Sequence, residues 1–117
     1  MELLVIVLNK TEYLTDILDG FVRAGIRGAT ILDSAGMGHL IANHFPFFAS
    51  FADYGMNKEQ HSKTIFTVVN SCDEKDNAIK VVDDVMGDIS KPNTAFLFSV
   101  PVNFVKGISI PECGDLR

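Results

Sequence analysis

Four short segments of the chain, residues 3–8, 29–32, 64–69 and 94–100, are dense in apolar and β-branched side chains. Each is too short for a core helix. Asn9 follows the first segment, and turn-forming Gly, Asn, Asp, Ser or Pro residues stand close to both ends of the other three. Runs of this kind are typical of β-strands, and an unbroken apolar run such as LLVIVL is typical of a strand covered on both faces. The pattern therefore predicts four strands.

Two helices are predicted between these strands from apolar residues at helical spacing. The first follows residues 9–12, whose Asn and Glu resemble a capping box, and ends near Gly25. The second follows residues 71–74, whose Ser and Glu repeat that signature, and ends at Gly87. The apolar positions are Tyr13, Leu14, Ile17, Leu18, Phe21 and Val22 in the first helix, and Ala78, Ile79, Val82, Val85 and Met86 in the second.

This order of elements predicts an α+β fold of the ferredoxin-like βαββαβ type, formed by residues 1–117 as a single domain. Right-handed crossovers place both helices on one face of a four-stranded antiparallel sheet, with a long loop between the second and third strands. The other face then lacks a cover, although the strands are apolar on both sides. We therefore expect an oligomer in which subunits pack sheet to sheet.

Composition and charge narrow the classes of function. A hydrophobic fraction of 47% is high for a subunit of 117 residues, which supports oligomerisation. The net charge of −5 argues against a nucleic-acid binder, which needs clustered Lys and Arg. The opening MELLVIVLNK fits neither a signal peptide nor a membrane span, so we expect a cytoplasmic protein without membrane insertion. Cys72 and Cys113 share no metal-ligand spacing and are expected to be reduced thiols.

Residues 35–62 form a long excursion between the second and third predicted strands, and such a segment is usually either a functional loop or disordered. It contains all three histidines, His39, His44 and His61, and imidazole is a common metal ligand. The spacing of the first two would put them on different sides of a helix. The excursion also contains an aromatic cluster that needs a cover from the chain itself, a neighbouring subunit or a partner protein. That cluster is Phe45, Phe47, Phe48, Phe51 and Tyr54.

Two stretches carry a resemblance to a known family: IRGATILDSAGMG at residues 26–38 and GDISKPNTAFLFSV at residues 87–100. The chain resembles the PII signal-transduction superfamily over about residues 1–105. In that family a G-x-T strand runs into a G-F-G turn that opens a long loop, and here residues 28–30 run into Gly36-Met37-Gly38. A second glycine-rich connection of the family corresponds to residues 87–93, which offer one basic residue, Lys91.

The resemblance implies a homotrimeric regulatory protein in signal transduction. It would bind a small-molecule effector, such as the adenine nucleotides ATP and ADP, in clefts between subunits, and would contact a regulated protein through residues 35–62. Glycines let backbone N–H groups approach phosphates, and a lysine supplies positive charge. The effector-binding residues that the resemblance implies are Thr30, Gly36, Met37, Gly38, His39, Gly87, Asp88 and Lys91.

Two alternatives remain open from the sequence. One is a metal-binding trimer of the CutA copper-tolerance type that uses the loop histidines His39, His44 and His61. The other is an adaptor without a sensing role, whose aromatic cluster binds a partner protein. Catalysis is not expected, because the chain has no G-x-S-x-G, no H-E-x-x-H and no Walker loop.

Overall fold

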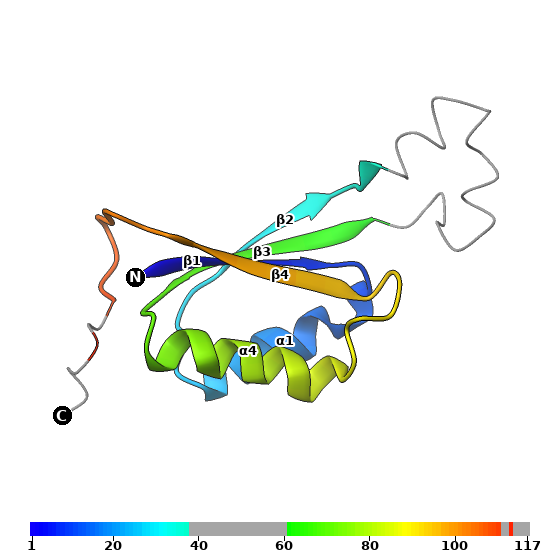
Figure 1. Ribbon diagram of the computed structural model, residues 1–117, viewed down its shortest axis with the longest axis horizontal. Coiled ribbons are helices and arrows are strands. Elements are labelled where there is room, and N and C mark those ends of the chain that lie inside the picture. The colour runs from blue at the N-terminus through cyan, green and yellow to red at the C-terminus, as the bar shows by residue number, and fades with distance from the viewer. Residues whose placement is uncertain (38–60, 111–112, 114–117) are drawn as a thin grey trace.

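The computed structural model describes residues 1–37, 61–110 and 113, and its elements follow the predicted order (Figure 1). They are β1 (Glu2–Leu8), the 3-10 turn η1 (Thr11–Tyr13), α1 (Leu14–Arg23), β2 (Thr30–Ser34), β3 (Ser62–Val69), α4 (Asp73–Met86) and β4 (Ala95–Pro101). The predicted α+β, ferredoxin-like arrangement is confirmed. The predicted loop, with His39, His44 and the aromatic cluster, lies almost wholly outside the described residues.

The four strands form one antiparallel sheet in the order β2-β3-β1-β4. The central strand β1 pairs with β3 on one side and β4 on the other, so Ile6 lies opposite both Ile65 and Leu97. Each strand-helix-strand unit is split by a strand from the other unit. Consequently β2 and β4 are the two edges of the sheet, and both helices lie against the same face (Figure 1).

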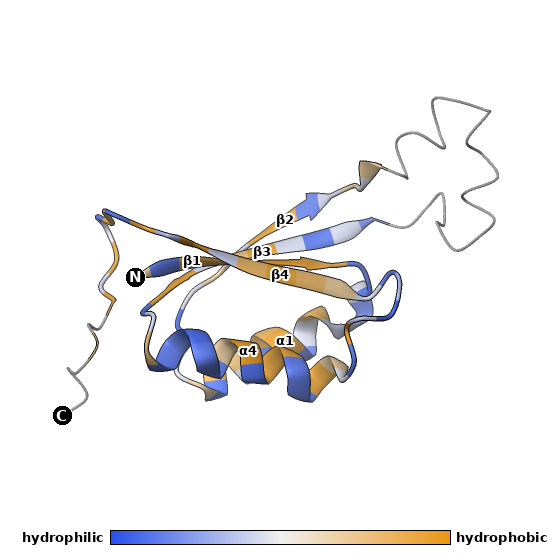
Figure 2. Ribbon diagram, in the orientation of Figure 1, coloured by the Kyte–Doolittle hydropathy of each residue, from blue (hydrophilic) through white to orange (hydrophobic). Residues whose placement is uncertain are grey.

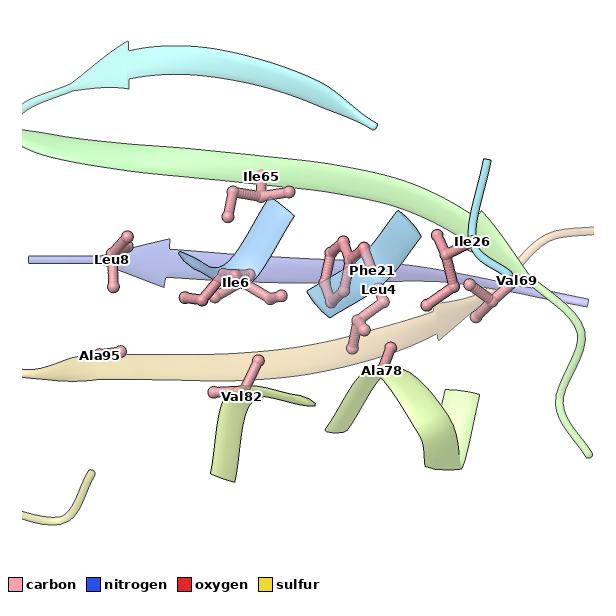
Figure 3. Close-up of a cluster of buried hydrophobic side chains, with 11 residues drawn as sticks. Leu4, Ile6, Leu8, Phe21, Ile26, Ile65, Val69, Ala78, Val82 and Ala95 are labelled. Atoms are coloured by element: carbon pink, nitrogen blue, oxygen red, sulfur yellow. The ribbon is translucent and has the colours of Figure 1, made fainter. Parts of the chain in front are cut away.

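The core lies between that face and the two helices. Side chains alternate between the faces of a strand, so even-numbered residues of β1 point at the helices together with odd-numbered residues of β3 and β4. Figure 3 shows these strand residues meeting Phe21 of α1 and both Ala78 and Val82 of α4. The largest fully buried side chains are Leu4, Ile6, Leu8, Ile17, Ile65, Val69 and Val82.

The two helices approach each other closely at Gly20. A Cβ atom on this residue would lie 2.6 Å from Val81 Cγ1, nearer than side-chain atoms can pack. Glycine in a helix interior costs about 1 kcal/mol relative to alanine, and at this position the cost is offset by the packing of α1 against α4. The conformationally demanding residue of α4 is its C-cap, Gly87, which has a φ of 72°.

Both predicted capping boxes are wrong in detail. At α1 the helix is entered through η1, and neither N-cap residue, Lys10 or Tyr13, makes a side-chain capping hydrogen bond. At α4 the cap is Asn70, one residue before the predicted Ser71. Its Oδ1 accepts hydrogen bonds from the backbone N–H groups of residues 72, 73 and 74, and Glu74 Oε1 accepts one from Asn70 N. Glu74 therefore has the role predicted for it, but its partner is Asn70, four positions before it, so the pairing resembles a capping box lengthened by one residue.

One ion pair joins the start of β1 to α4 beneath the sheet. Lys75 Nζ lies 2.9 Å from Glu2 Oε2, and the Ser99 hydroxyl donates to Glu2 Oε1 at 2.7 Å. The hydrogen bonds from Lys75 and Ser99 lower the pKa of Glu2 below its ordinary value of 4.5. The charged carboxylate is therefore favoured by folding.

The position of this pair predicts a pH dependence of stability. Because the pKa of Glu2 is lowered in the folded state, its contribution is present above pH 4.5 and is lost as the pH falls through the folded value. We expect the melting temperature of Glu2→Gln to fall less steeply than that of the wild type as the pH is lowered from 4.5. Thermal melts at several pH values measure this. The variants Lys75→Met and Glu2→Gln/Lys75→Met should share the shallower dependence, and a wild-type slope in all three would contradict the assignment.

Candidate functional site

The face of the sheet that points away from the helices carries apolar side chains from all four strands. We call it the open face. On β4, Phe96 and Phe98 are 53% and 47% exposed, and their rings stack with centroids 6.3 Å apart. Val5 is buried on this face because it lies between Phe66 and Phe98. The apolar members of the open face are Leu3, Val5, Val7, Leu32, Phe66, Val68, Phe96, Phe98 and Val100.

At the end of β2 and the start of β3, the side chains of the open face carry hydroxyl groups. Ser34 Oγ lies 2.6 Å from Ser62 Oγ and 2.9 Å from Thr64 Oγ1, and Ser62 is buried. On the opposite face of the same strands, Lys63 Nζ bonds the carboxylate of Asp33 and lowers its pKa. These contacts hold β2 to β3 at the base of the excursion. The open face therefore changes from apolar to polar side chains where the pairing of β2 with β3 ends.

The first group of residues implied by the resemblance lies along the β2 edge. Thr30 is exposed at the start of β2 and pairs with Phe66. Gly36 and Met37 follow the end of β2, and both are exposed. Gly38 and His39 lie outside the described residues. The structure therefore places three members of this group, all on one edge strand or directly after it.

The second group, Gly87, Asp88 and Lys91, lies in the connection between α4 and β4, and all three residues are exposed. Asp88 Oδ1 accepts hydrogen bonds from the backbone N–H of Ser90 at 3.0 Å and from its hydroxyl at 2.6 Å. These hydrogen bonds lower the pKa of Asp88. The connection is fixed at its end by Thr94, whose carbonyl oxygen accepts from the N–H groups of residues 9 and 10.

The two groups are not brought together within one subunit. They flank opposite edges of the sheet, because β3 and β1 lie between β2 and β4. Three inter-strand spacings of about 4.8 Å separate them by about 14 Å or more. Thus Thr30 and Lys91 could share a ligand only if the β2 edge of one subunit met the β4 edge of another.

A cleft of about 840 Å³ opens beside the start of β2. One wall is the connection of residues 25–30, which includes the G-A-T motif of residues 28–30. Thr67 Oγ1 donates to the carbonyl oxygen of Gly28 at 2.7 Å and holds this wall to β3. Leu3, Phe66 and Val68 of the open face line the floor, and residues 108–110 line the remaining side.

The segment that follows β4 was not anticipated as part of any site. It continues the ladder by one hydrogen bond, from Val102 N to Met1 O at 3.1 Å, and then reaches the cleft at residues 108–110. Beyond the cleft, Cys113 forms a disulfide with Cys72, and their Cα atoms are 5.7 Å apart. The expectation of two reduced thiols is therefore wrong. Spacing along the chain could not show the pairing, because the two cysteines are 41 positions apart and only the fold brings them together.

Within residues 1–37, 61–110 and 113, no group of three His, Cys, Asp or Glu side chains is placed to hold a metal ion. His61 is exposed just before β3, and the other two histidines lie outside the described residues. In the described part of the chain, no helix is both long enough and apolar enough to cross a membrane.

Compared with known proteins, the chain matches no protein-family model and no curated protein. What the fold defines is an α+β protein with a ferredoxin-like sheet, one face covered by two helices and one face open (Figure 2). Figure 2 shows β4, which lies at one edge of that sheet, as predominantly hydrophobic.

Proposed function

We propose that the chain is the subunit of a PII-like regulatory homotrimer. Subunits pack through their open faces, and each cleft at a subunit boundary binds a small-molecule effector, with an adenine nucleotide such as ATP or ADP as the expected class. Residues 35–62 contact a protein partner and signal to it that the effector is bound. The observation that carries the proposal is that the G-A-T motif of residues 28–30 lines a cleft at the margin of an uncovered apolar sheet face.

The physical support for assembly is the area of apolar surface that one subunit leaves in water. Small monomers rarely expose several large apolar side chains on one continuous face, because burying them is favourable by about 25 cal/mol per Å². On the open face, Phe96, Phe98, Val100 and Leu32 are all exposed. Sheet-to-sheet packing of identical subunits would cover them without a second protein.

The support for an inter-subunit ligand site is the separation of the two motif groups. Neither the β2 edge nor the connection of residues 87–91 forms a complete phosphate site by itself, since the first lacks a lysine and the second lies away from the cleft. A neighbouring subunit can supply the missing part. Exposure of Thr30, Gly87 and Lys91 leaves all three accessible to such a neighbour.

The proposal predicts that Lys91→Glu weakens nucleotide binding. Isothermal titration of the wild type with Mg-ATP or Mg-ADP should give micromolar affinity, which corresponds to about 8 kcal/mol. Reversing the charge at residue 91 should raise the dissociation constant by about tenfold or more, because the ammonium group is replaced by a carboxylate facing the phosphates. The dissociation constant of AMP, which has a single phosphate, should change less on this substitution.

The matched control is Lys80→Glu, which makes the same change of charge at an exposed position of α4. This variant should bind nucleotide as the wild type does. Equal affinity of wild type and Lys91→Glu would contradict the assignment of residue 91 to the site. Absence of binding at millimolar nucleotide would contradict the nucleotide class itself.

A further inference from the structure

The segment after β4 is attached to the rest of the molecule chiefly at its two ends. We call the described residues 102–110, together with Cys113, the strap. One end is held by the hydrogen bond from Val102 N to Met1 O, and the other by the disulfide to Cys72. Residues 103–110 form no hydrogen bond with any other part of the chain that the structure describes. The disulfide is therefore the main restraint on the far end of the strap.

The strap is poorly buried along its length. Phe104 and Ile108 are exposed, the latter by 57%, and Gly107 has a φ of 103°, which turns the chain. Few apolar contacts and few hydrogen bonds are the features of a segment that opens at low cost. Held in place, however, residues 108–110 line the cleft together with Gly28, Thr30 and Val68.

The anchor point of the strap lies on a rigid part of the fold. Cys72 immediately precedes α4, and its N–H donates to Asn70 Oδ1 at 3.1 Å within the α4 cap. Asn70 is itself buried. Because the cap and the helix hold Cys72 in position, the disulfide fixes where Cys113 lies, and with it the path of the strap past the cleft.

We propose that the Cys72–Cys113 disulfide makes the strap a releasable wall of the cleft, so that effector affinity depends on the redox state of this pair. The inference rests on the proposed function, because the cleft is the same one. A dithiol reductant transfers two electrons and two protons to the pair. The sulfur–sulfur bond breaks, two thiols form, and the reductant becomes a disulfide. The strap then leaves the cleft, which loses the contacts of residues 108–110.

The first arm of the test uses no ligand. Limited tryptic digestion of the full chain is followed by mass spectrometry, without reduction and after treatment with dithiothreitol, blocking of the thiols and removal of the reagents. We expect cleavage after Lys106, an exposed residue of the strap, to become faster on reduction, while cleavage after Lys80 within α4 stays slow. The chain has two cysteines, so no other pair can respond. Cys113→Ser should show the fast cleavage after Lys106 with and without reductant. An unchanged rate of cleavage after Lys106 on reduction would overturn the proposal.

The second arm measures affinity for Mg-ATP by titration in both redox states. We expect the dissociation constant to rise by about tenfold or more on reduction, because apolar contacts of the wall are lost. Ile108→Ser/Ile110→Ser should weaken binding under oxidising conditions without breaking the disulfide. Equal affinity in both states, with the strap shown to be released, would overturn the proposal. Faster cleavage after Lys106 on reduction, without nucleotide binding in either state, would support the releasable wall and contradict the proposed function.

Discussion

Replacing Phe98 by Asp is expected to reduce the proposed assembly to single subunits of 12.8 kDa. Phe98 lies near the middle of the open face, opposite Val5 of the central strand, and is 47% exposed in the isolated subunit. A carboxylate buried between two sheets without a partner costs several kcal/mol, whereas in a separate subunit it stays in water. Light scattering after size-exclusion chromatography measures the change in mass.

The control for this variant is Val22→Asp, which introduces the same charge at another exposed apolar position. Val22 is 73% exposed on α1, on the helix side of the molecule. It should leave the mass of the assembly unchanged. Circular dichroism of Phe98→Asp should retain the wild-type spectrum, since the side chain is not part of the core. Retention of the full assembly mass by Phe98→Asp would contradict packing through the open face.

Truncation of Phe21 to Ala should produce the largest loss of folding stability. Its ring is 2% exposed and meets Leu4 and Ile26 in the core (Figure 3). Removing a buried phenyl group costs about 3–5 kcal/mol, which is a large part of the roughly 5–15 kcal/mol that stabilises a domain of this size. Denaturant unfolding, followed by far-ultraviolet circular dichroism, measures the difference in free energy.

The neighbouring residue provides the comparison. Val22→Ala removes apolar atoms from the same helix, but from a side chain that is 73% exposed, so its effect should stay within about 0.5 kcal/mol. The two substitutions differ mainly in burial. Equal losses of stability for Phe21→Ala and Val22→Ala would contradict the placement of the core.

The fold could be predicted because it depends on patterns local to each element. Short β-branched runs and two apolar stripes at helical spacing indicate βαββαβ, and right-handed crossovers then fix the sheet order. The stripe prediction was wrong at Val22, which is adjacent in sequence to the buried Phe21 but points to solvent. Hydrophobic periodicity locates the centre of the buried face of a helix well but its margin poorly. At the margin, a small difference in angle about the helix axis decides whether a side chain is buried or exposed.

The candidate site was predictable only in part, since it depends on contacts between distant segments. The motif residues Thr30, Gly36 and Lys91 could be found from their resemblance, but their separation by two strands follows from sheet order. The capping role of Asn70 was missed because two adjacent residues, Asn70 and Ser71, can both cap a helix. The Cys72 disulfide and the strap beside the cleft depend on tertiary structure alone.

The measurement that tests the central proposal most directly is native mass spectrometry of the full chain titrated with Mg-ATP under oxidising conditions. We predict a species with three times the subunit mass of 12.8 kDa that takes up as many as three nucleotides, one for each cleft. Phe98→Asp should lose both the assembly and the uptake, because each proposed site is formed by two subunits. A monomer, or a trimer that remains free of nucleotide at millimolar concentration, would contradict the account.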